Sequence, residues 1–308
     1  MKNPFKVILP PSQSKNVIVT HAIGFDYLKK WEENSRYTWE LYCKKHELGL
    51  IVLTETIDDD GKKYHWQKLL IPKELIKYYD INNFCYLDTD IVISPLAPNI
   101  FDIHNSRKIG IISQFKNLPY NRLATLKRCA FFRHTFYNKE YPLDSSLFFS
   151  AKQQFKYHGL KGHDDYACAG VFVGNCIYHG EFFSSIFYKY QGEFKSIDGG
   201  GEEVFLNHHL LESEYVQWLP YKWQALWIFE MPWCHSHLYE NDNKQSIVNS
   251  ITTSLYNSYF LHFAGSWEGI HWNECKHLKD HLNVETFNAF ETYNKMKLTK
   301  RPKGLIKR

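Results

Sequence analysis

Long apolar runs, paired cysteines and glycosylation sites are all missing from this sequence of 308 residues. No run approaches the length of a membrane-spanning helix, and the mean hydropathy of −0.44 argues against a membrane-embedded protein. The seven cysteines are scattered without a Cys-x-x-Cys motif, a pattern typical of reduced thiols. The apolar residues 7–9 before Pro10 are too few for a signal-peptide core. We therefore expect a soluble, cytoplasmic protein.

Excess basic charge is also missing from most of the chain. Seven of the 37 Lys and Arg residues lie in residues 295–308, where there is no acid, and the rest holds 30 basic against 33 acidic residues. We therefore expect no nucleic-acid partner. The basic tail is expected to be a solvated arm, and its functional alternative is peripheral contact with an anionic membrane.

Strand and helix patterns alternate along the chain. Short apolar runs predict strands at 17–20, 50–53, 84–87, 109–113, 167–173, 216–219 and 259–263. Helical apolar spacing predicts helices at 25–45, 65–79, 181–190 and 202–211. This alternation predicts an α/β fold with a mostly parallel sheet flanked by helices. Residues 116–162 have no clean period and are expected to form an irregular, aromatic-rich insertion.

Two aspartates, Asp88 and Asp90, follow the apolar run at 84–87. The C-terminal ends of strands in α/β sheets open onto the ligand crevice. Carboxylates this close repel each other unless a cation lies between them, and a hard divalent ion that holds a substrate's phosphates would serve. A polar strand end followed by a turn is the plain alternative.

Three later segments strengthen the catalytic interpretation. They are Ala169–Gly174, the glycine-rich Asp198–Asn207 and His262–Trp267. With residues 88–90, their order resembles the nucleotide-sugar-dependent glycosyltransferases of the GT-A fold, most of all the glycogenin and bacterial lipopolysaccharide galactosyltransferase group. The resemblance spans roughly residues 17–270.

The resemblance implies a Rossmann-like GT-A catalytic domain over residues 1–280. Its donor-binding half would extend to about residue 115 and its sugar- and acceptor-binding half over 116–280, followed by a C-terminal helix and basic tail at 281–308. The activity would be sugar transfer from a nucleotide-diphosphate donor, with UDP the expected nucleotide. The acceptor would be a hydroxyl of a glycan, a lipid-linked glycan or a protein.

The resemblance also implies roles for individual residues. Mn²⁺ or Mg²⁺ would be held by Asp88, Asp90 and His262, with Asp88 shared between the metal and the ribose. The donor would be bound by Thr20, His21, Lys68, Asp88, Thr89, Gly170, Gly265 and Trp267. The catalytic residues would be Glu202, Glu203 and Asp90. The plain alternatives are a solvated lysine at 68, a buried strand at 170, a core histidine at 262 and helix-stabilising carboxylates at 202 and 203.

Two departures from the family pattern leave alternatives open. No lysine follows Gly265 until Lys276, and Cys168 replaces an asparagine usual in the family, so the sugar preference is not carried over. The stretch from Gly199 to Glu203 also resembles a segment of inverting galactosyltransferases, in which case Glu203 would be the general base. Without a base, a retaining front-side displacement is the default. A haloacid-dehalogenase-type phosphatase, whose first aspartate is a nucleophile, and an inactive carbohydrate-binding homologue are the rival functions.

Overall fold

The computed structural model describes residues 2–137, 146–190, 201–265 and 267–282, together with positions 285 and 292. The predicted basic arm at 295–308 and the start of the glycine-rich segment at 198–200 lie outside the described residues. Among the helices in these ranges, none is both long and apolar enough to cross a membrane.

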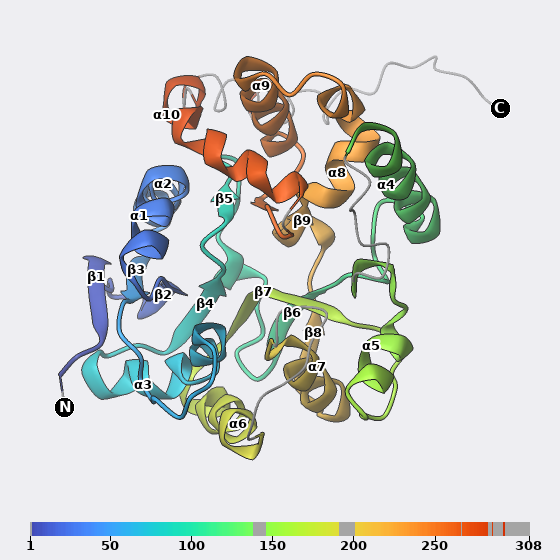
Figure 1. Cartoon of the computed structure of the whole chain (residues 1–308). Coiled ribbons are helices and arrows are strands. Elements are labelled where there is room, and N and C mark those ends of the chain that lie inside the picture. The colour runs from blue at the N-terminus through green and yellow to red at the C-terminus, as the bar shows by residue number, and fades with distance from the viewer. Residues whose placement is uncertain are drawn as a thin grey trace, which may run out of the picture.

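A seven-stranded mixed sheet forms the centre of the molecule (Figure 1). Its order is β1-β3-β2-β4-β7-β6-β8, and β1 and β7 run against the direction shared by the other strands. The strands are β1 (Phe5–Leu9), β2 (Asn16–His21), β3 (Gly49–Leu53), β4 (Asn83–Leu87), β6 (Ile109–Ser113), β7 (Ala167–Asn175) and β8 (Val216–Trp218). The predicted α/β class with a mostly parallel sheet is confirmed.

Helices cover both faces of this sheet because its strands carry apolar side chains on both sides. Val17 and Val19 of β2 join one hydrophobic core with α3, α6 and α7, whereas Ile18 between them joins a second core with α1 and α2. The helices are α1 (Phe25–Asn34), α2 (Arg36–Lys45), α3 (Ile71–Tyr78), α4 (Arg122–Phe136), α5 (Ala151–Tyr157), α6 (Cys176–Lys189), α7 (Glu203–Glu212), α8 (Trp227–Cys234), α9 (Lys244–Leu255) and α10 (Leu278–His281). The 3₁₀ helices are η1 (Tyr64–Leu69), η2 (Ile100–Asp102), η3 (Ser146–Phe148), η4 (Tyr221–Gln224), η5 (Ser236–Tyr239) and η6 (Glu268–His277).

Several of the expected elements differ in detail, and the helix predicted over 65–79 is divided into η1 and α3. The helix predicted over 25–45 is broken at Ser35, whose hydroxyl donates to the Thr89 carbonyl (2.7 Å) and accepts from the Trp272 indole (2.8 Å). The segment 116–162, expected to be irregular, contains α4 and α5. The helical period of α4 is blurred because Leu123 and Phe131 are exposed, each by 62%.

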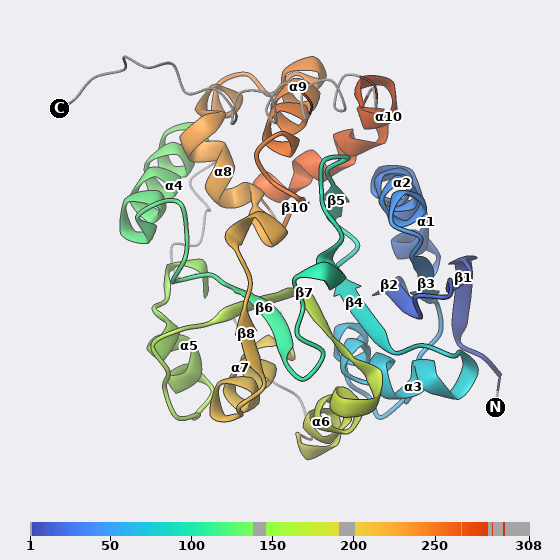
Figure 2. The same ribbon diagram turned by 180° about the vertical axis from the view of Figure 1, so that it is seen from behind.

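A small second sheet lies beside the main one, with α8, α9 and α10 beyond it (Figure 2). Its strands are β5 (Ile91–Ile93), β9 (Ala225–Leu226) and β10 (Phe260–His262). β10 pairs antiparallel with β5, which places His262 opposite Ile91, and the Phe263 N–H donates to the Asp90 carbonyl (3.0 Å). This pairing brings residue 262 next to the Asp88–Asp90 turn.

Candidate active site

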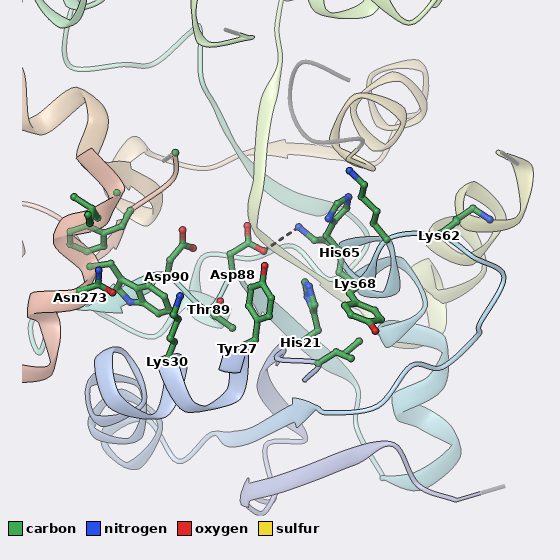
Figure 3. Close-up of a pocket in the computed structure, with 18 of the residues that line it drawn as sticks. His21, Tyr27, Lys30, Lys62, His65, Lys68, Asp88, Thr89, Asp90 and Asn273 are labelled. Atoms are coloured by element: carbon green, nitrogen blue, oxygen red, sulfur yellow. Dashed lines mark hydrogen bonds and ion pairs between the residues drawn. The ribbon is translucent and has the colours of Figure 1, made fainter. Parts of the chain in front are cut away.

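A cleft of about 880 Å³ opens at the C-terminal ends of β2 and β4. Figure 3 shows side chains from four separate stretches of the chain converging on it. Residues predicted from the sequence that line the cleft are His21, Lys68, Asp88, Thr89, Asp90 and Gly265. The position is the one expected for the ligand crevice of an α/β sheet.

Asp88, Asp90 and His262 form a cluster with the geometry of a metal site. One ligand atom from each lies within 4.8 Å of the others. His262 Nε2 is 3.1 Å from Asp90 Oδ1 and 3.9 Å from Asp88 Oδ2. The carboxylates are about a quarter exposed and the imidazole is buried. Two carboxylates and one imidazole suit Mn²⁺, and the oxygens suit Mg²⁺, so the residues fit the predicted ion.

The ring nitrogen of His262 that does not face Asp90 contacts side chains from other elements. This atom, Nδ1, lies 3.0 Å from Gln224 Nε2 and 3.7 Å from Cys168 Sγ. Burial alone would lower the pKa of His262, but the Asp90 carboxylate outweighs it and raises the pKa well above the ordinary value. His262 and Asp90 are therefore electrostatic partners across the cluster.

Gly170 has its closest neighbours in this metal cluster. A Cβ atom there would lie 2.4 Å from His262 Cε1 and 2.7 Å from Gln224 Nε2, closer than real contacts allow. The Gly170 carbonyl accepts the Asp88 N–H (2.8 Å). The absence of a side chain at 170 therefore makes room for His262.

Lys68 is buried between two carboxylates. Its ammonium donates to Asp88 Oδ1 (3.1 Å), lies 2.8 Å from Glu202 Oε1, and its side chain is 5% exposed. Burial alone would lower the pKa of Lys68, but Asp88 and Glu202 raise it above its ordinary value. Burial alone would raise the pKa of Asp88. The positive charges of Lys68 and His262 outweigh it and lower the pKa to about 2. Lys68 is thus a buried ion-pair partner rather than a solvated lysine.

Tyr86 and His21 form a hydrogen-bonded chain that ends on Asp88. The Tyr86 hydroxyl donates to Asp88 Oδ1 (2.6 Å) and lies 2.7 Å from His21 Nδ1. The two rings are stacked, with centroids 5.8 Å apart. Burial, followed by the Lys68 charge, lowers the pKa of His21 to about 3. His21 is therefore neutral.

Three other predicted residues, Thr20, Glu203 and Trp267, are not among those that line the cleft. Glu203, on the first turn of α7, accepts the Ala169 N–H on β7 through Oε2 (2.9 Å). Trp267 stacks on Tyr137, with centroids 5.5 Å apart. Thr20 is buried, and its hydroxyl has no hydrogen-bond partner among the described residues.

Sequence reasoning missed several residues that line the cleft. They are Ile23, Tyr27, Lys30, Asp59, Gly61, Lys62, Lys63, Tyr64, His65, Phe263, Gly269, Ile270 and Asn273. The run 61–65, a glycine followed by basic and aromatic residues between a strand and a helix, was a usable signal. Gln224 and Tyr86 gave none, because their importance comes from neighbours distant in sequence.

No protein-family model and no curated protein matches the chain. Among solved structures, a glycosyltransferase involved in glycosylation of the major capsid of PBCV-1 has a TM-score of 0.49 and 10% identity, covering 84% of this chain and 98% of that one. The bifunctional glycosyltransferase WbbM has a TM-score of 0.43 and 11% identity, covering 84% of this chain and 46% of that one. Mouse xyloside xylosyltransferase 1 has a TM-score of 0.37 and 12% identity, covering 82% of this chain and 99% of that one. At these low values the function rests on the chain's own residues.

Proposed function

We propose that the protein is a metal-dependent glycosyltransferase that moves a sugar from a nucleoside-diphosphate donor, a UDP-sugar, to a hydroxyl acceptor. The convergence of Asp88, Asp90 and His262 beside the cleft carries the proposal. Two of these residues follow β4 and the third ends β10, 172 positions later in the chain. Such a triad at the crevice end of the sheet is suited to holding a divalent ion against phosphates.

The protein groups divide the work around the ion. Bound Mn²⁺ or Mg²⁺ would neutralise the charge that develops on the departing nucleoside diphosphate. Asp88 Oδ1 is engaged by Lys68 and Tyr86, which leaves Oδ2 for the ion. The two hydrogen bonds to Oδ1 hold the whole carboxylate of Asp88 in place. The position of Oδ2 is therefore set before the ion binds.

His21 supports a nucleoside as part of the donor. A carboxylate only accepts, so the single hydroxyl hydrogen of Tyr86 goes to Asp88, and His21 must donate its Nδ1–H to the Tyr86 oxygen. The Nε2 of this neutral imidazole then carries no hydrogen and is an acceptor. Uracil N3–H or a ribose hydroxyl would satisfy it, so we assign His21 to the nucleoside.

The contacts of Glu202 and Glu203 favour a retaining reaction. Glu202 is matched by Lys68 (2.8 Å), and one oxygen of Glu203 is bonded to β7. These bonds suit residues that hold β7 and α7 near the donor better than a base free to take a proton. The base role of Glu203 stays a prediction, which the anomeric configuration of the product, read by NMR, would decide.

The acceptor side is the least defined part of the proposal. Tyr27, Tyr64 and Ile270 line the cleft and are each more than half exposed, which suits contact with the apolar face of a sugar. The acceptor class, the donor and acceptor halves of the chain, and membrane contact by residues 295–308 all stay predictions.

A donor panel tests the proposal. The protein would be incubated with UDP-, GDP- and CMP-sugars, with and without Mn²⁺, and nucleotide release measured. We expect Mn²⁺-dependent UDP release that Asp90→Asn abolishes while its circular dichroism stays unchanged, since the substitution removes a charged ligand. Asp102→Asn, at an exposed aspartate on η2, is the matched control.

Four results would contradict the proposal. Full activity of Asp90→Asn, or full activity in excess chelator, would reject the metal mechanism. Phosphate release from p-nitrophenyl phosphate would support the phosphatase instead. Metal and UDP-sugar binding with no turnover would support the inactive carbohydrate-binding homologue.

A further inference from the structure

Lys30 is a cleft lysine with no counter-ion in the described part of the chain. It lies on α1, is exposed, and lines the cleft together with Thr89 and Asp90. Figure 3 shows it on the same side of the cleft as these two residues. Within residues 2–137, 146–190, 201–265 and 267–282, no carboxylate pairs with its ammonium. Its charge is therefore available to a ligand.

Two of the three other lysines that line the cleft, Lys68 and Lys62, are matched by carboxylates of the protein. Lys68 is 3.1 Å from Asp88 and 2.8 Å from Glu202. Lys62 is paired with Asp60. These ammonium groups would have to give up a carboxylate before they could bind an anion.

The charges around the metal cluster leave a role for one more cation. Asp88, Asp90 and Glu202 carry three negative charges, of which Lys68 balances one. A divalent ion balances the remaining two when His262 is its neutral ligand. A bound sugar nucleotide then brings one negative charge on each of its two phosphates, and nothing in this set balances them.

The wall of the cleft next to α1 offers no substitute cation. It comes from η6, which packs against α1 and contributes Ile270, Trp272 and Asn273. The chain holds no Lys or Arg between Gly265 and Lys276. At the start of η6, Glu268 is buried and bound to Arg133 (2.7 Å), which commits that arginine as well.

We infer that Lys30 binds the diphosphate of the donor. The inference rests on the proposed function and adds to it a residue on α1 that balances one of the two phosphate charges. An ammonium on a flexible stem is suited to this, because it acts as a point charge that follows the phosphates without a fixed geometry.

The test separates phosphate binding from nucleoside binding. Mn²⁺-loaded wild type, Lys30→Ala and Lys30→Arg would be titrated with UDP, inorganic pyrophosphate and uridine by calorimetry. We expect Lys30→Ala to weaken UDP and pyrophosphate by about 10-fold, the usual scale of one charge-assisted hydrogen bond. Uridine binding should not change, and Lys30→Arg should retain most of the UDP affinity.

Lys29→Ala is the matched control. Lys29 is the preceding residue on α1, is 59% exposed and lies 3.9 Å from Glu33. Its removal changes the net charge equally, so it should leave the affinity for UDP within about two-fold, as expected for an exposed pair. Unchanged UDP affinity in Lys30→Ala, equal weakening by Lys29→Ala, or parallel loss of uridine binding would overturn the inference. Failure of wild type to bind UDP with Mn²⁺ would instead overturn the proposed function.

Discussion

Replacing Gly170 by alanine would test how closely β7 must approach the metal cluster. The added Cβ would lie 2.4 Å from His262 Cε1, whereas an ordinary contact is 3.4–4 Å. The imidazole must therefore move by about 1 Å to reach an ordinary contact. The added Cβ has no room of its own to shift toward Gln224, whose Nε2 would lie only 2.7 Å away. A metal tolerates ligand displacements of only about 0.2 Å.

The expected effect of Gly170→Ala follows from this displacement. We expect Mn²⁺ affinity, measured by calorimetry without any nucleotide, to fall by about 10- to 100-fold. Overpacking of this buried strand should also lower the free energy of unfolding by about 1–3 kcal/mol, measured by urea denaturation in excess chelator.

Gly174→Ala separates the two effects. Gly174 lies on the same strand, and its added Cβ would be 3.1 Å from Phe84 Cε1 and 3.2 Å from His179 Nδ1, away from the metal residues. We expect a loss of stability with unchanged Mn²⁺ affinity. If Gly170→Ala binds Mn²⁺ as tightly as wild type, the close contact at His262 does not position the ligand and the reasoning fails.

Two further predictions concern buried charges. Lys68→Met should lower the free energy of unfolding, measured by urea denaturation, by about 3–5 kcal/mol, since Asp88 and Glu202 lose their shared cation. Adding Glu202→Gln should restore part of this loss. A smaller loss of stability in Lys68→Met alone would contradict the buried pairing. Because the pKa of His21 is lowered to about 3, the unfolded chain binds a proton that the native protein does not between pH 6.5 and 3. Wild-type stability should therefore fall relative to His21→Phe by about 1.4 kcal/mol per pH unit as pH drops through this window, whereas equal slopes would show an unperturbed His21.

Much of the sheet could be predicted from the sequence because its strands are short apolar runs buried on both faces. Residues 50–53 and 167–173 are examples, and all of β3 and β7 is buried. β1 was missed because it is partly exposed at the sheet edge. The helix break at Ser35 was missed because its cause, the Thr89 carbonyl, lies 54 residues away.

The sequence by itself determined which groups could bind a metal: Asp88 and Asp90 are two residues apart after a strand, so their proximity needs no fold. Only the tertiary structure decided the rest of the site. The pairing of β10 with β5 brings His262 to Asp90, and burial turns Lys68 into the shared partner of Asp88 and Glu202. Distances between such remote residues depend on strand register and packing across the whole chain, which no local pattern of residues encodes.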